Sequence, residues 1–126
     1  MPFIQIKSLP FEKALDVSNI ILAINRDFAS VNNLAIYHVH TTWEYFQPGH
    51  YAKGEDAPEF QPNASHPVIV DLLTPDFNKA EVIELMLSSL AKSIVTHTNI
   101  NRNNVFINHR YARSGMVFDD DAIVKW

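Results

Sequence analysis

An internal repeat is the feature that most constrains how this chain can fold. Each copy has a strand that opens on a proline, a break, an amphipathic stretch, a connector and a second strand. The matching segments are 1–4 with 66–69, 9–10 with 74–75, and 33–36 with 104–107. Because the copies agree at both ends, the repeat predicts a duplicated β-α-β unit.

The spacing of apolar residues assigns the parts of each unit. In the first unit, residues 2–8 and 34–46 are rich in strand-forming residues, and the apolar residues between about 12 and 28 recur at helical spacing. In the second unit we expect strands at 66–73 and 105–110, with a helix ending near Val95. Asn78 followed by Glu81 has the capping-box pattern, which predicts the start of that helix.

Two such units predict an α+β, two-layer fold. Right-handed crossovers make the two strands of each unit parallel and bring both helices onto one face of a shared, four-stranded mixed sheet. We expect a single domain over residues 1–126, with repeat halves at about 1–46 and 66–112 and a C-terminal β-hairpin at 115–126. The other face of the sheet remains uncovered, which favours an oligomer in which sheets face each other.

Residues 47–65 differ in composition from the rest of the chain. They contain three prolines, two glycines and three acidic residues. Loops of this length without regular structure are uncommon in compact domains and are often functional, so we expect an ordered loop or flap.

Composition excludes several classes of function. The net charge is −4 and no basic stripe is present, so we expect no nucleic-acid partner. The chain has no cysteine, which excludes disulfides and thiolate chemistry and fits a cytoplasmic protein. It contains neither a recognisable signal peptide nor an apolar run long enough to cross a membrane, so we expect no membrane partner.

Pro2 directly follows the initiator methionine. A small second residue normally permits removal of that methionine, which would leave a prolyl secondary amine at the end of a strand. Such an amine can act as a base or a nucleophile. The alternative is purely structural, since proline is tolerated at the first residue of a strand.

The chain resembles the tautomerase superfamily, which includes 4-oxalocrotonate tautomerase and macrophage migration inhibitory factor. The resemblance rests on Met1-Pro2 opening a strand, the duplicated β-α-β unit, the chain length, and the segments 104–108 and 114–118. It implies a homotrimer with a pocket at each subunit interface, Pro2 as the catalytic residue at the bottom of that pocket, and neither a cofactor nor a metal.

The same resemblance suggests which residues would bind substrate. Phe106, Asn108 and Arg110 alternate onto one face of their strand, and Asn108 stands where the family often has a pocket asparagine. Arg110 and Arg113 are the arginines near the expected pocket, and Phe118 resembles an aromatic residue that closes it. Each has a structural alternative: a cross-strand hydrogen bond for Asn108, a solvated surface position for the arginines, and hairpin packing for Phe118.

His38 and His40 share a strand face, a pattern that can bind zinc. No carboxylate stands in a matching position, so we expect no metal site there.

These observations favour a cofactor-independent tautomerase that moves a proton on a small keto-enol substrate, with Pro2 as the base. Two alternatives remain: a hydrolytic dehalogenase or hydratase on the same scaffold, and a non-enzymatic binding protein that retains the fold. The first unit carries no lysine or arginine at residues 30–36, where several branches of the family have one, so the substrate class stays open.

Overall fold

A computed structural model describes residues 1–126 as a four-stranded sheet, two helices and a small hairpin. The sheet contains β1 (Phe3–Ser8), β2 (His40–Tyr45), β3 (Val68–Pro75) and β4 (Val105–Ala112) in the order β2-β1-β3-β4. β1 and β2 are parallel, β3 and β4 are parallel, and the central pair β1 and β3 is antiparallel. The predicted mixed sheet built from two β-α-β units is confirmed.

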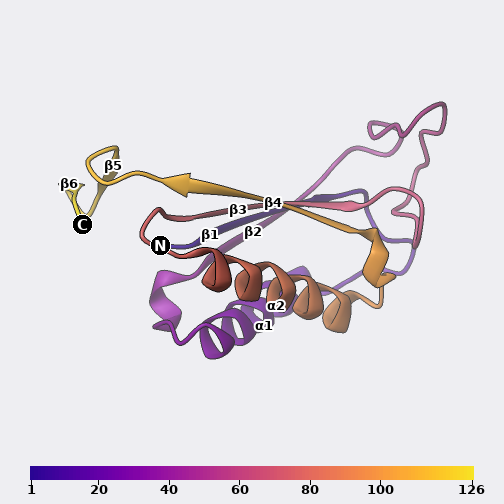
Figure 1. Cartoon of the computed structure of the whole chain (residues 1–126). Coiled ribbons are helices and arrows are strands. Elements are labelled where there is room, and N and C mark those ends of the chain that lie inside the picture. The colour runs from indigo at the N-terminus through magenta and orange to yellow at the C-terminus, as the bar shows by residue number, and fades with distance from the viewer.

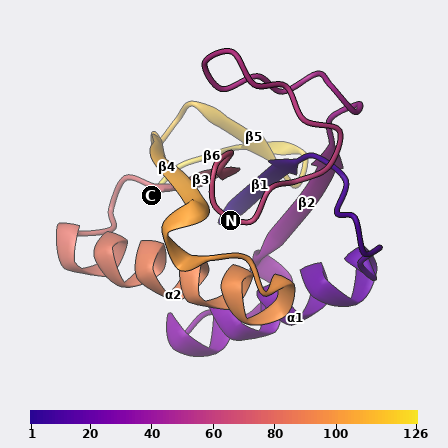
Figure 2. The same ribbon diagram turned by 90° about the vertical axis from the view of Figure 1, so that its right-hand side faces the viewer.

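The molecule has two layers. Helices α1 (Val17–Val31) and α2 (Ala80–Thr98) lie side by side against one face of the sheet, and no helix covers the other face (Figures 1 and 2). We call this other side the open face. The predicted arrangement, with both helices on one side, is confirmed.

The core lies between the sheet and the helices. Side chains on β1 alternate strictly between exposed and buried positions, and Ile4 and Ile6 point into the core. β3 contributes Val68, Val70 and Leu72 in the same way. Residues at helical spacing on both helices complete this cluster: Ile20, Ile24, Phe28, Ile83, Met86, Leu90 and Ile94.

The first unit differs from the sequence prediction at two boundaries. Helix α1 begins at Val17 rather than near residue 12, because the Asp16 carboxylate accepts a hydrogen bond from the backbone N–H of Asn19 at 3.3 Å and caps the helix there. The expected strand over 34–46 is shorter, because Ile36–His38 forms a 3₁₀ turn and β2 starts only at His40.

The predicted capping box at the start of α2 is wrong. Lys79 is the N-cap and makes no side-chain capping bond. The Asn78 amide instead donates to the Pro75 carbonyl at 3.0 Å, so it stabilises the turn that joins β3 to the helix. The helix also continues to Thr98, three residues beyond the expected end, and stops at Asn99 in the left-handed conformation.

The predicted C-terminal hairpin is confirmed as β5 (Val117–Asp119) and β6 (Ala122–Val124), which pair antiparallel. Asp120 and Asp121 make the tight turn with positive φ. Trp126 holds the C-terminal end of the chain against Asp76 and Phe77. Its indole N–H donates to the Asp76 carboxylate at 2.7 Å, and its ring packs edge-on to Phe77. The hairpin is thereby tied to the β3–α2 turn.

Residues 47–65 form an ordered extension that we call the arm. It joins β2 to β3 and projects beyond the sheet at the end away from the chain's N-terminus (Figure 1).

Neither helix of this chain combines the length and the apolar character required to cross a membrane.

Candidate active site

Pro2 directly precedes β1 and is buried. Its carbonyl accepts a hydrogen bond from the backbone N–H of His40 at 3.1 Å, which ties it to β2. On the other side, the register pairs Phe3 with Leu73 of β3, so the next position brings Pro2 opposite the buried Thr74. Pro2 therefore occupies a fixed position between two strands.

The amino terminus next to Pro2 is in an environment that favours a neutral amine. Partial burial lowers the pKa of the Met1 amine below its ordinary value, and the negative charge of Asp119 acts against this shift. Asp119 belongs to β5, so the hairpin contributes a carboxylate to the electrostatics of the chain's first residues.

Phe106, Asn108 and Arg110 occupy the exposed positions of β4 and face the open side of the sheet. The predicted alternation of these side chains is confirmed. The register pairs Arg110 with Leu73, the partner of Phe3, whereas Asn108 pairs with Asp71 and Phe106 with Ile69. At about 3.3 Å per residue, Phe106 lies about 13 Å further along the sheet than Arg110. The structure therefore does not gather these three side chains around the Pro2 of the same chain.

Arg110 makes a two-pronged ion pair with Asp71 of the neighbouring strand. Its Nε donates to both carboxylate oxygens at 2.9 and 3.1 Å, and its Nη2 donates to Oδ2 at 2.5 Å. Hydrogen bonds from Arg110 hold the pKa of Asp71 below its usual range, and the carboxylate raises the pKa of the guanidinium. Together with Phe3, Gln5 and Leu73, the pair lines a shallow hollow of about 280 Å³ on the open face. Arg110 is therefore already committed to an anionic partner within its own chain.

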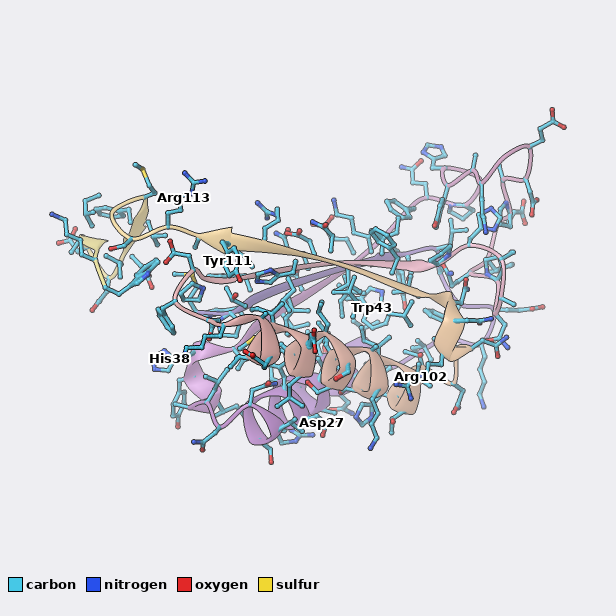
Figure 3. The ribbon with its side chains drawn as sticks, viewed as in Figure 1. Asp27, His38, Trp43, Arg102, Tyr111 and Arg113 are labelled. Carbon is cyan, nitrogen blue, oxygen red and sulfur yellow. The ribbon has the colours of Figure 1, made fainter.

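Arg113 and Phe118 lie beyond the end of β4. Arg113 follows the strand, on the open side of the sheet (Figure 3), and makes no ion pair within the chain. Phe118 lies on β5 and is 68% exposed. The guanidinium of Arg113 and the ring of Phe118 are therefore free to contact a ligand or a second copy.

Comparison with solved structures places this arrangement in a known fold. Pt0534 inactivated by 2-oxo-3-pentynoate has a TM-score of 0.81 at 11% identity, covering 97% of this chain and 94% of that one. A fused 4-OT in an asymmetric trimer has a TM-score of 0.80 at 9% identity, with coverage of 96% and 94%. A macrophage migration inhibitory factor from Oncomelania hupensis has a TM-score of 0.74 at 11% identity, with coverage of 98% and 97%. This chain has the tautomerase-superfamily fold.

The similarity lies in the structure rather than in the sequence. No protein-family model matches the chain, and no curated protein matches it either. The predicted resemblance to the tautomerase superfamily is confirmed as a similarity of fold over nearly the whole chain.

The tautomerase fold of this chain contains a polar pair near Pro2 that sequence reasoning missed. His109 Nε2 lies 2.7 Å from the hydroxyl of Thr74, the residue opposite Pro2. Burial lowers the pKa of His109, which favours the neutral imidazole, although Asp71 acts in the opposite direction. Tyr111, on the helix side of β4 (Figure 3), packs edge-on to His109 at 4.6 Å. The strand period of two places residues 109 and 111 on the helix side of β4. This alternation was the feature of the sequence from which their shared side could have been predicted.

The prediction that His38 and His40 share a strand face is wrong. His40 stacks on Phe3 with ring centroids 4.4 Å apart, and His38 belongs to the preceding 3₁₀ turn. No cluster of three or more histidine, cysteine, aspartate or glutamate side chains that could hold a metal ion is found in the chain.

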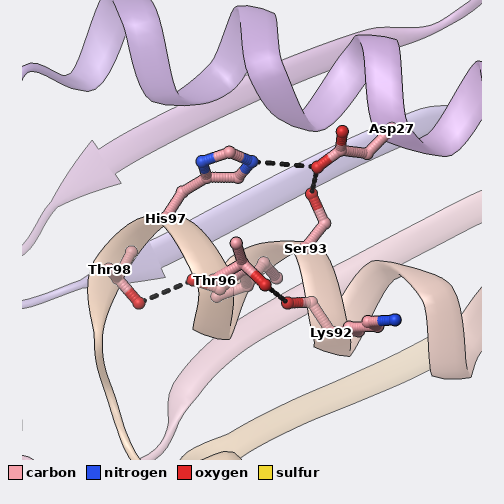
Figure 4. Close-up of polar contacts among 7 residues, drawn as sticks. Asp27, Lys92, Ser93, Thr96, His97 and Thr98 are labelled. Carbon is pink, nitrogen blue, oxygen red and sulfur yellow. Dashed lines mark hydrogen bonds and ion pairs between the residues drawn. The ribbon is translucent and has the colours of Figure 1, made fainter.

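A second polar cluster joins α1 and α2, on the side of the sheet opposite the open face. The Asp27 carboxylate accepts hydrogen bonds from Ser93 at 2.7 Å and His97 at 2.9 Å (Figure 4). Burial acts to raise the pKa of Asp27, but the two hydrogen bonds together with the positive charges of His97 and Arg26 lower it on balance. Ser93 is buried and bonded to the carboxylate rather than to the imidazole, so the cluster lacks the arrangement of a nucleophilic triad. It connects α1 to α2.

Proposed function

We propose that this protein is a cofactor-independent tautomerase that uses Pro2 as a general base on a small keto-enol substrate. The observation that carries the proposal is the location of Pro2, buried directly before β1 in a tautomerase-superfamily fold. Removal of Met1 would convert the nitrogen of this residue from an amide into a secondary amine.

The chemistry requires a base that is neutral near pH 7. An α-amino group has a pKa of roughly 8 in model peptides. Burial lowers the pKa of the terminal amine in this structure, and the same direction for the prolyl amine would increase its unprotonated fraction near pH 7. The base would remove a proton α to a carbonyl group, and hydrogen-bond donors would stabilise the resulting enolate.

The pocket for this reaction would form between copies of the chain. Phe106 and Asn108 are too far along the sheet from Pro2 to serve it within one chain, yet both are exposed on the open face. A homotrimer, as in the fused 4-OT, would bring these residues of one copy to the Pro2 of another. In this proposal Phe106, Asn108, Arg113 and Phe118 bind and orient the small-molecule substrate, whereas Arg110, which is already paired with Asp71, contributes little to binding.

The first experiment establishes whether Pro2 is a free amine. We expect the intact mass of the purified protein to correspond to a chain without Met1. Incubation with 2-oxo-3-pentynoate, the inactivator of Pt0534, should then add one label per chain on the N-terminal peptide.

The second experiment tests catalysis. Pro2→Ala should lower kcat/KM for tautomerisation of phenylpyruvate by at least about 100-fold, the usual contribution of a general base. Pro67→Ala is the matched control, because Pro67 is the repeat counterpart of Pro2 but is held in a peptide bond. Wild-type activity in Pro2→Ala, or a mass that retains Met1 in an active preparation, would contradict the proposal.

A further inference from the structure

The arm has two legs and a defined tip. The two legs are the segments before and after the tip at residues 53–56. The backbone N–H of Gly49 in the first segment donates to the Pro58 carbonyl in the second at 3.1 Å, which holds the two segments side by side. At the tip, Lys53 and Asp56 exchange backbone hydrogen bonds of 2.9 and 3.2 Å. Gly54 turns the chain there with a φ of +61°, a conformation that favours glycine. The arm is thus a hairpin-like projection.

Buried polar groups fix the arm to the body of the protein. His66 is 1% exposed, and its ring lies beneath the tip, where Nε2 is 2.9 Å from the Asp56 carbonyl. Tyr51 packs edge-on to His66 at 5.1 Å and donates its hydroxyl to the Pro67 carbonyl. At the base, Gln61 accepts from the backbone N–H of Leu9 at 3.0 Å. Ordering a chain costs about 1–2 kcal/mol of conformational free energy per residue. The contacts of these side chains offset part of that cost and hold the arm in one position relative to the sheet.

The arm cannot serve the Pro2 of its own chain. It leaves the sheet at Phe46, whose N–H donates to the carbonyl of Ser8 at the far end of β1. Ser8 lies six residues after Pro2 along an extended strand, a distance of about 20 Å. The arm also projects away from the N-terminus (Figure 1).

The arm instead rises on the open side of the sheet. Both views place it opposite the helices (Figures 1 and 2). Phe106 lies on the open face at the same end of the sheet, since it pairs with Ile69 close to where the arm rejoins β3. Any copy of the chain that packs on the open face near Phe106 therefore meets the arm as well.

We propose that the arm of one copy covers the Pro2 site of a neighbouring copy and shields it from water. This inference rests on the proposed function, because it requires Pro2 to act in a pocket between copies. The partner that contacts the arm on the open side of the sheet is a second copy of this chain. Excluding water there strengthens the electrostatic interactions that stabilise an enolate and prevents loss of the reactive intermediate.

Complementation between two defective chains tests the proposal. In the first chain, two glycines replace residues 50–57, a short link that the hydrogen bond between Gly49 and Pro58 permits. The second chain carries Pro2→Ala and an intact arm. The two chains are co-expressed with different tags, and mixed oligomers are purified through both tags and assayed with phenylpyruvate.

Each homo-oligomer should have at least 10-fold less activity than the wild type. The mixed oligomer should exceed the sum of the two by at least threefold, because an arm from the Pro2→Ala chain can cover the intact Pro2 of the armless chain. Full activity of the armless chain, or a mixed oligomer no better than the sum, would overturn the inference. Substantial activity of the Pro2→Ala homo-oligomer would instead refute the proposed function.

A second measurement on the full-length chain does not depend on the folding of the armless variant. A photo-reactive residue placed at the exposed Ala57 should cross-link, on irradiation, to the N-terminal peptide or hairpin of another chain. Mass spectrometry of mixed light and isotope-labelled chains distinguishes links between chains from links within one. Links found exclusively within one chain, or no links at all, would contradict the inference.

Discussion

At the scale of residues, the two candidate arginines differ in what they already bind. Arg110 has two of its three guanidinium nitrogens bonded to Asp71, whereas Arg113 makes no ion pair within the chain. A substrate carboxylate would have to displace Asp71 from Arg110, but would meet no such competitor at Arg113. We therefore expect Arg113→Gln to raise KM for phenylpyruvate by about 10-fold, the loss of about 1.4 kcal/mol of binding.

Arg110→Gln is the matched control, and its KM should change by less than about threefold. Steady-state kinetics on both variants, with kcat reported separately, provides the comparison. A larger rise in KM for Arg110→Gln than for Arg113→Gln would show that Asp71 positions Arg110 for the substrate instead of occupying it.

Single residues were also the hardest to predict from the sequence. Asn78 and Glu81 have the correct spacing for a capping box, but the nearby Pro75 carbonyl competes for the Asn78 amide and the helix starts one residue later than this pattern requires. The ion pair between Asp71 and Arg110 depends on the register of β3 with β4, which no local pattern specifies. The alternation of Phe106, Asn108 and Arg110 was predictable because a strand has a fixed period of two.

At the scale of elements, α2 stabilises the fold through a narrow apolar stripe. Leu90 is fully buried between α2 and the sheet, whereas Leu85 on the same helix is 46% exposed. Leu90→Ala should lower the free energy of unfolding by about 3 kcal/mol, because it removes apolar contacts and leaves a cavity. Chemical denaturation of the purified variant measures this change.

Leu85→Ala is the corresponding control, since it makes the same chemical change on the same helix. Its effect should stay within about 0.5 kcal/mol, as for most surface substitutions. Equal losses for the two variants would mean that α2 is packed on its outer side as well, for example against another copy.

The existence and order of the elements followed from the sequence, whereas their ends did not. Strongly periodic apolar residues identify α1 and α2 wherever the exact boundaries lie. The start of α1 depends on a single cap at Asp16, and the 3₁₀ turn at Ile36–His38 lies within residues that favour strand. The position of the arm could not be predicted from local sequence patterns either, because it depends on contacts of Gln61 with Leu9 and of His66 with Asp56.

At the scale of the whole molecule, the open face combines exposed aromatic groups with polar ones. Phe3 and Phe106 are 39% and 56% exposed there, alongside Gln5, Asp71 and Arg110. A surface of this kind resembles the interface of an oligomer, in which apolar anchors are surrounded by polar groups. The sequence predicted an uncovered face. Which polar residues lie side by side on that face follows only from the register of the strands.

An oligomer that closes the open face should be disrupted by a charge placed on that face. Phe106→Glu would bury a carboxylate without a partner between copies, a cost of several kcal/mol that the interface would have to overcome. We expect light scattering coupled to size-exclusion chromatography to give the mass of a trimer for the wild type and of a monomer for this variant. Tyr37→Glu is the control, because Tyr37 is 90% exposed but lies outside the sheet, in the 3₁₀ turn, and its variant should keep the wild-type mass. A Phe106→Glu protein that remains trimeric would exclude the open face around Phe106 as the interface, and with it the pocket that combines this face with the Pro2 of another copy.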